Sequence, residues 1–144
     1  MPVSDDTDSH DFDRFVQAQD PVYADVLAEL GRGRKSSHWM WFIFPQLAGL
    51  GQSSLSRRFA IADLAEAQAY LAHPVLGARL RECTDLVNRV EGRDIHAIFG
   101  SPDDLKFHSS MTLFHRAAPG ETIFHTALQR YFGGGLDART LSLL

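Results

Sequence analysis

The stretch that decides the fold is PVLGARLRECTDLVNRVEG, residues 74–92. Pro74 suits the first position of a helix, and Gly92 suits the residue after its end. Between them, apolar side chains recur at steps of three and four residues, which is the spacing of one helical face. These side chains are Leu76, Leu80, Cys83, Val87 and Val90. The segment therefore predicts a long helix that buries one face.

Similar patterns on both sides of this segment predict further helices. Asp63 and Glu66 have the spacing of a capping box, which starts a helix that runs toward Ala72. Apolar stripes between turn residues predict helices over residues 12–19, 21–30, 103–118 and 123–132, and shorter ones near 54–59 and 94–99. A last helical turn is expected to be capped by Asp137 or Thr140.

The most apolar run of the chain is HWMWFIFP, residues 38–45. It has no clear period, so a short buried helix and a buried strand both fit it. The helix is favoured because nearly every other segment has a helical pattern. Pro45 ends the element in either case.

Length and composition, together with these helical patterns, predict the fold class. The chain has 144 residues, of which 44% are hydrophobic, enough for one buried core. We predict a mainly α, single compact multi-helix domain over residues 11–144, with orthogonal helix packing and room for one or two very short strands. Residues 1–10 are acidic and poor in apolar side chains, which predicts a disordered tail.

Charge and cysteine content limit the function classes. A formal net charge of -4 disfavours a nucleic-acid partner held by the overall field of the protein. A lone cysteine, Cys83, and an N-terminus without a signal-peptide pattern indicate a cytoplasmic location. The longest apolar run is far short of the ~20 residues that cross a bilayer, so no membrane segment is expected. The seven histidines form no HExxH pattern, and we expect neither a metal site nor a cofactor.

The first candidate site spans Lys35 to Ser53. Aromatic rings offer stacking surfaces for a planar heterocycle, while cations and a glycine loop suit an anion such as phosphate. The candidate ligand-binding residues are Lys35, Ser36, His38, Trp39, Trp41, Gln46, Gly51 and Ser53. The competing interpretation is that Trp39, Trp41, Phe42 and Phe44 pack in the core and that the basic turn, residues 32–37, is only a solvated link.

The second candidate site lies on the helix that starts at Asp103. Lys106 shares a face with Ser109 and Ser110, a pattern compatible with serine-lysine chemistry or with ligand binding. Asp104 and His108 are four residues apart and could exchange a proton with a substrate. Exposed helix faces also carry such residues without any catalytic role, so a capping and surface function is the alternative.

Three segments resemble the uncharacterised bacterial family called domain of unknown function 1810. They are GRKSSHWMWFIFPQ at residues 33–46, YLAHPVLG at 70–77, and DLK at 104–106 with SSMTLF at 109–114. The resemblance covers nearly the whole chain and implies a mainly helical fold with no settled activity. The family is also distantly similar to helical proteins thought to cleave N-glycosidic bonds in ADP-ribose-like or riboflavin-precursor compounds. The calpastatin label sometimes given to the family does not fit, because such an inhibitor is a disordered repeat chain.

The leading hypothesis is a binder or N-glycosidase-like hydrolase of a nucleotide-derived small molecule, such as an ADP-ribose or flavin-precursor compound. Lys35 and Lys106 would pair with phosphate, Trp39 or Trp41 would stack, and Asp104 or Glu66 would supply a carboxylate. The alternative is a non-enzymatic module that uses exposed aromatic side chains to dock a partner chain or a second copy as a homodimer. RNA binding through the basic turn is a third hypothesis.

Overall fold

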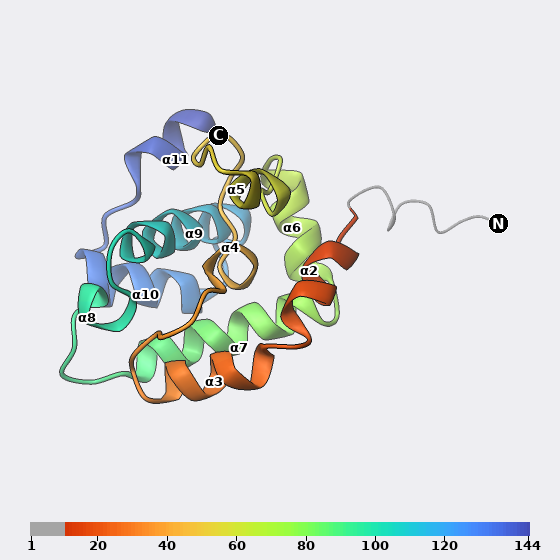
Figure 1. Ribbon diagram of the computed structural model, residues 1–144. Coiled ribbons are helices and arrows are strands. Elements are labelled where there is room, and N and C mark those ends of the chain that lie inside the picture. The colour runs from red at the N-terminus through yellow and green to blue at the C-terminus, as the bar shows by residue number, and fades with distance from the viewer. Residues whose placement is uncertain (1–10) are drawn as a thin grey trace.

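Two long helices, α7 (Leu76–Arg89) and α9 (Asp103–Ala117), form the centre of the fold in the computed structural model, which describes residues 11–144 (Figure 1). Helix α7 packs against α3, α6 and α10, and α9 packs against α6, α8, α10 and α11. The disordered tail predicted for residues 1–10 lies outside the described residues. The predicted mainly helical single domain is confirmed.

The remaining elements of the described residues are also helices. They are α2 (Asp13–Gln19), α3 (Tyr23–Gly31), α4 (Met40–Ile43), α5 (Ser54–Arg58), α6 (Leu64–Ala72), α8 (Ile95–Phe99), α10 (Thr122–Phe132) and α11 (Ala138–Leu143). Extended pairing within residues 11–144 is limited to one parallel bridge between Leu47 and Ile61. The apolar run at 38–45 forms the single-turn helix α4, which confirms the helical alternative. Pro21 and Pro74 lie just before α3 and α7 rather than at their first positions.

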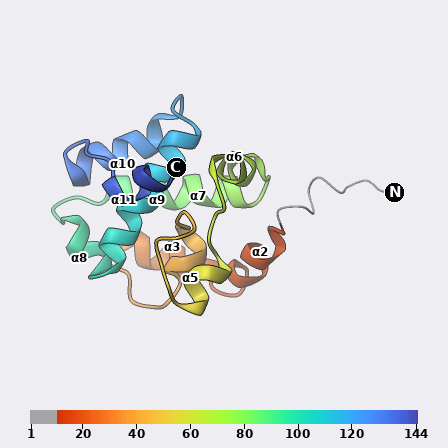
Figure 2. The same ribbon diagram turned by 90° about the horizontal axis from the view of Figure 1, so that it is seen from above.

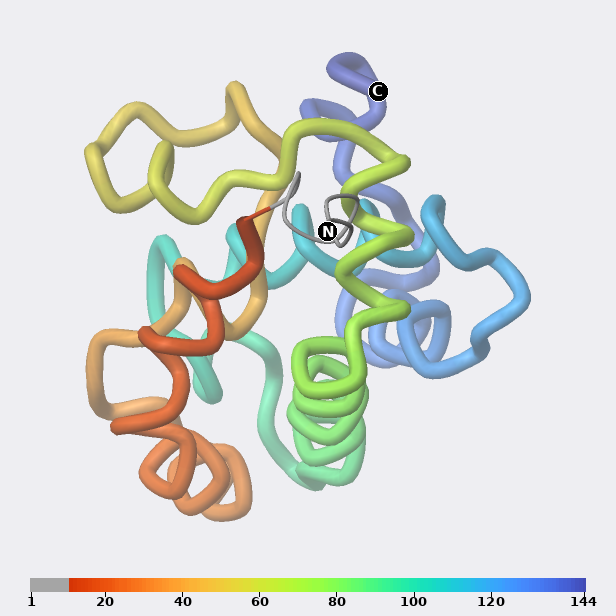
Figure 3. The backbone as a smooth tube through the Cα atoms, turned by 90° about the vertical axis from the view of Figure 1, so that its right-hand side faces the viewer, coloured from red at the N-terminus to blue at the C-terminus, as the bar shows by residue number. Residues whose placement is uncertain are grey.

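Four of the five side chains in the predicted apolar stripe of α7 are buried, and the fifth, Val90, is half-buried directly after the end of the helix. Leu76, Leu80, Cys83 and Val87 are each 1% exposed or less. The preceding helix, α6, is steeply inclined to α7. In Figure 3, α7 is the green coil viewed almost along its axis, and α6 rises above it, seen from the side. Gly77 permits this joint, because a Cβ atom there would lie 2.1 Å from the carbonyl oxygen of Leu71.

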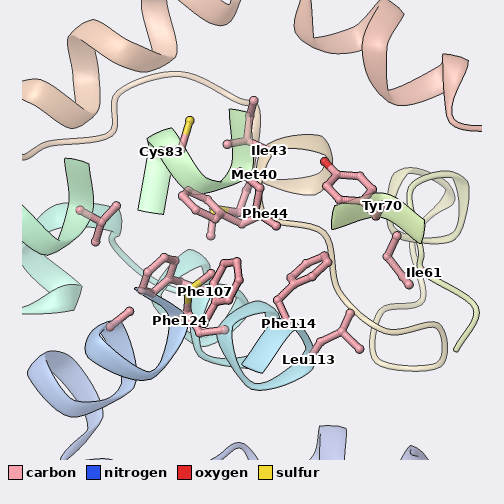
Figure 4. Close-up of a cluster of buried hydrophobic side chains, with 14 of the residues drawn as sticks. Met40, Ile43, Phe44, Ile61, Tyr70, Cys83, Phe107, Leu113, Phe114 and Phe124 are labelled. Carbon is pink, nitrogen blue, oxygen red and sulfur yellow. The ribbon is translucent and has the colours of Figure 1, made fainter. Parts of the chain in front are cut away.

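Aromatic side chains from distant segments meet in the core. Met40 and Phe44 from the α4 segment lie on the side of Phe107 and Phe124, and Ile43 lies on the side of Cys83 (Figure 4). Phe44 meets Phe107 edge to face, with ring centroids 5.0 Å apart and planes at 87°. The short α4 is therefore held by tertiary packing, because one helical turn alone is not stable in water.

The C-terminal helix α11 lies against α9 and beside the loop that leads from α4 to α5 (Figure 1, Figure 2). The Asp137 N–H donates to Thr112 Oγ1 on α9 at 2.9 Å. On the loop side, Arg139 Nη2 donates to the carbonyl oxygen of Leu50 at 3.3 Å. The end of the chain is thus brought to the two segments that carry the candidate site residues.

Candidate functional site

Two adjoining cavities lie where the loop after α3, the start of α9 and the C-terminal helix meet. The turn cavity, about 340 Å³, is lined among others by Lys35, Ser36, His38, Trp41, Asp103 and Lys106. The C-terminal cavity, about 260 Å³, is lined among others by Gln46, Gly51, Lys106, Ser109, Asp137 and Arg139. Lys106 and Pro102 line both cavities. The fold therefore joins the two candidate regions of the sequence at Lys106.

The only two lysines of the chain converge on one carboxylate. Lys35 Nζ lies 2.9 Å from Asp103 Oδ2, and Lys106 Nζ lies 3.6 Å from Asp103 Oδ1. The Lys35 side chain is 8% exposed and also donates to the carbonyl oxygen of Ser37. Its charge is thus already compensated, which leaves Lys106, 22% exposed, as the more available cation of the pair.

A buried glutamate, Glu29 on α3, holds the basic turn in place through hydrogen bonds. Its carboxylate accepts hydrogen bonds from the N–H groups of Ser36 (2.7 Å) and Ser37 (3.0 Å), and from the Ser37 hydroxyl (2.6 Å). A fourth comes from the indole N–H of Trp39 at 2.9 Å. Burial opposes the charge of Glu29, but the Ser37 hydroxyl and the other donors outweigh it and lower the pKa of Glu29 to about 2. Glu29 is therefore an anion, and its hydrogen bonds hold the turn in the conformation that shapes the turn cavity.

The two indoles have different surroundings. Trp39 is 1% exposed, with its indole N–H on Glu29, so it belongs to the core and has no free face for a ligand. Trp41 is half-buried and lines the turn cavity. The ammonium of Lys106 lies 5.0 Å from the centroid of the Trp41 ring, within the range of a cation-π contact. Of the two predicted stacking residues, the geometry keeps Trp41.

The C-terminal cavity contains a second carboxylate, Asp137, at the start of α11. Asp137 Oδ2 accepts from Thr140 Oγ1 (2.6 Å), Ser109 Oγ (3.0 Å) and Thr140 N–H (3.1 Å). Burial opposes the charge, yet the donors from Thr140 and Ser109 lower the pKa of Asp137 below its usual value. Gly51 in the wall of this cavity must lack a side chain, because a Cβ there would lie 2.4 Å from Ser56 Oγ.

Several predicted site residues do not line these two cavities. The Asp104 carboxylate lies 3.2 Å from His96 Nδ1, and His108 Nε2 lies 2.8 Å from the carbonyl oxygen of Gly135, so the two do not pair. Glu66 accepts from the Ala62 N–H at 2.8 Å as part of the helix start. Neither carboxylate is therefore placed to act on a ligand in the two cavities.

The predicted serines are also divided by the fold. Ser53 caps α5 by accepting the Ser56 N–H at 3.1 Å. Ser110 is fully buried, and its hydroxyl has no hydrogen-bond partner within residues 11–144. Ser109 bonds to Asp137, and the described part of the chain shows no hydrogen bond between Lys106 and either Ser109 or Ser110. The geometry thus provides no serine-lysine pair.

Sequence reasoning missed four residues of this region: Glu29, Asp103, Asp137 and Arg139. Asp103 carried a local signal, since it precedes Lys106 by one helical turn. Asp137 was predicted only as a helix cap. Glu29 and Arg139 carry no local pattern that separates them from ordinary surface residues, and only the tertiary fold brings them to the site.

Residues 11–144 contain neither a metal-ligand cluster nor a membrane-spanning helix. Within 11–144, no three His, Cys, Asp or Glu side chains are grouped to hold a metal ion. No helix in this range has both the length and the apolar character needed to cross a bilayer.

These features define a small all-helical domain with a two-part polar cleft built around one lysine. The chain belongs to the family described as protein of unknown function, DUF1810, whose model matches residues 9–144. It is 59% identical to the conserved hypothetical protein Rv1873 from Mycobacterium tuberculosis, whose crystal structure it matches with a TM-score of 0.94. The match covers 95% of this chain and 98% of that one. A search of curated proteins found no match.

Proposed function

We propose that this protein binds a nucleotide-derived small molecule, such as an ADP-ribose or flavin-precursor compound, across the two cavities. The observation that carries the proposal is the position of Lys106. It lines both cavities and holds its ammonium over the ring of Trp41. A ligand with a planar ring and an anionic group can therefore use Trp41 and Lys106 together.

The size and charge of the site support this ligand class. Small-molecule sites usually have volumes of about 300–1,000 Å³, and the two cavities of about 340 and 260 Å³ together reach that range. Three cations, Lys35, Lys106 and Arg139, line them against the two carboxylates Asp103 and Asp137. The excess positive charge favours an anionic ligand.

N-glycosidic hydrolysis is the reaction that the resemblance to glycosidic-bond-cleaving helical proteins favours, and binding is its first step. We further propose a cytoplasmic location, since the lone Cys83 is buried and cannot form an intramolecular disulfide.

The docking alternative has less support. The exposed large apolar side chains within residues 11–144 are all aliphatic, namely Leu55, Val75, Leu105, Leu143 and Leu144.

Replacing Lys106 by Ala is expected to weaken binding at least tenfold, about 1.4 kcal/mol, while the melting temperature stays within a few degrees. The reason is that Lys106 contributes a charge to both cavities but is not buried in the core. Isothermal titration with ADP-ribose, NAD and AMP measures the affinity, and a thermal melt measures the fold.

Arg116→Ala is the matched control, because Arg116 is an exposed cation on the same helix that lines neither cavity. Unchanged affinity in K106A, or an equal loss of affinity in both variants, contradicts the proposal. A large fall in melting temperature together with lost binding makes Lys106 a structural residue instead.

A further inference from the structure

We propose that Asp137 is the catalytic carboxylate of this site and that the substrate is a phosphorylated N-ribosyl compound whose ribose lies in the C-terminal cavity. This inference rests on the proposed function and adds the reacting residue and the placement of the substrate. It differs from the sequence-based hypothesis, which assigned the carboxylate to Asp104 or Glu66.

The hydrogen bonds of Asp137 leave one of its oxygens unused. All three donors, from Ser109 and Thr140, bond to Oδ2. Within residues 11–144, Oδ1 accepts no hydrogen bond, although the residue lines a cavity of about 260 Å³. The cap of α11 and the hydrogen bond to Ser109 on α9 therefore account for the position of Oδ2 only. The second oxygen is held rigidly and remains available to a water molecule or a sugar.

The other carboxylates near the cleft are engaged. Asp103 is flanked by the ammonium groups of Lys35 and Lys106, at 2.9 and 3.6 Å. Asp104 and Glu66 line neither cavity. Asp137 is thus the carboxylate of the two linings that keeps an oxygen free of a cation.

The neighbours of Asp137 indicate how a substrate would lie. Lys106 and Arg139 line the same cavity and can bind a phosphate. Trp41 lines the adjoining cavity on the other side of Lys106 and can stack on the departing base. A ribose between the phosphate and the base then has its anomeric carbon in the C-terminal cavity, beside Asp137.

The reaction requires only water as co-reactant. The bond between the anomeric carbon and the base nitrogen breaks, and its electron pair leaves on the nitrogen. The Asp137 carboxylate stabilises the positive charge that develops on the sugar. A water oxygen forms the new bond to the anomeric carbon, one water proton passes to Asp137 Oδ1, and that proton is then released to solvent. A base that leaves as an anion, such as adenine, takes a proton from solvent, whereas nicotinamide leaves as a neutral molecule and takes none. The products are the free base and the ribose phosphate, and Asp137 returns to its ionised form.

The test uses two variants that keep the helix cap. Asn and Ser cap helices about as well as Asp, so Asp137→Asn and Asp137→Ser remove the charge while α11 stays in place. Asp85→Asn is the control, because Asp85 on α7 forms a surface ion pair with Arg89 and lines neither cavity. Release of free base from AMP, NAD, nicotinamide mononucleotide and ADP-ribose is followed by chromatography, and affinity by titration calorimetry.

We expect the full chain to release base from at least one of these probes. Both Asp137 variants should then turn over at least 100-fold more slowly, within the range of a lost acid-base or charged catalytic group, with affinity changed less than threefold. If the wild-type chain binds a probe but cleaves none, or if D137N cleaves at more than a third of the wild-type rate, the catalytic role is overturned and the binding proposal stands. If no probe binds, both fail.

Discussion

The Glu29→Gln variant should unfold with a free energy lower than that of the wild-type chain by about 3 kcal/mol, since hydrogen bonds to buried charged groups contribute about 1.5–3 kcal/mol each and are not additive. Glu29 is 5% exposed and accepts four hydrogen bonds, all from the turn that follows α3. Glutamine offers one acceptor oxygen and replaces the other with an amide that itself donates. At least one donor of the turn is then left buried and unpaired.

The loss should depend on pH in a way that identifies the carboxylate. The folded pKa of Glu29, about 2, is below the value of 4.5 for a free glutamate. Its contribution to stability is therefore fully present above pH 4.5 and is lost as the pH falls from there toward 2. The stability difference between wild type and E29Q should shrink over that interval.

Urea denaturation at pH 7, 5 and 3 measures this difference. Glu91→Gln, an exposed glutamate on the loop after α7, is the control and should change stability by less than about 0.5 kcal/mol. A difference between wild type and E29Q that stays constant from pH 7 to 3, or one as small as that of the control, would show that Glu29 does not hold the turn as an anion.

The second large effect is expected from Gly77→Ala, which should destabilise the protein by about 3 kcal/mol or more, at or beyond the upper end for overpacking. An added Cβ would lie 2.1 Å from the backbone oxygen of Leu71 and 2.9 Å from Arg81 Nη1. The arginine can move, but the carbonyl belongs to α6. The two helices must separate, and the core between them loses contacts.

The sign of this effect distinguishes packing from helix propensity. Alanine is a better helix former than glycine by about 1 kcal/mol, so propensity alone predicts that G77A is stabilised. Gly31→Ala is the control, because Gly31 ends α3 and a Cβ there meets nothing within 4 Å. Thermal and urea denaturation should give a neutral or stabilised G31A and a strongly destabilised G77A. Equal effects in the two variants would contradict the close approach of α6 and α7.

The helices were accessible to sequence reasoning because their signals are local. The capping pattern at Asp63, the apolar stripe of α7 and the acidic start of α9 each lie within one element, and all three correspond to helices in the structure. The run at 38–45 was ambiguous for a physical reason. A segment that is apolar on every side has no periodic pattern, and its conformation is decided by the core around it.

Sequence reasoning predicted only part of the candidate site. The dense motif around Lys35 and the helix of Lys106 indicated the two walls of the turn cavity, but their meeting depends on contacts far apart in sequence. Trp39 shows the limit of residue type as a signal, since an indole in a ligand-like motif is instead held in the core by Glu29. Asp137 reaches Ser109 from 28 residues away, a contact that no local spacing encodes.

The central claim, that the cleft around Lys106 takes a nucleotide-derived ligand beside Trp41, is tested most directly by the two indole N–H signals in a ¹H–¹⁵N NMR spectrum. Trp41→Phe assigns them, and ADP-ribose and AMP are the probes. A saturable shift of the Trp41 signal, with the signal of the buried Trp39 unchanged, is the predicted result. A Trp41 signal that stays in place up to millimolar concentrations of both probes would contradict the account.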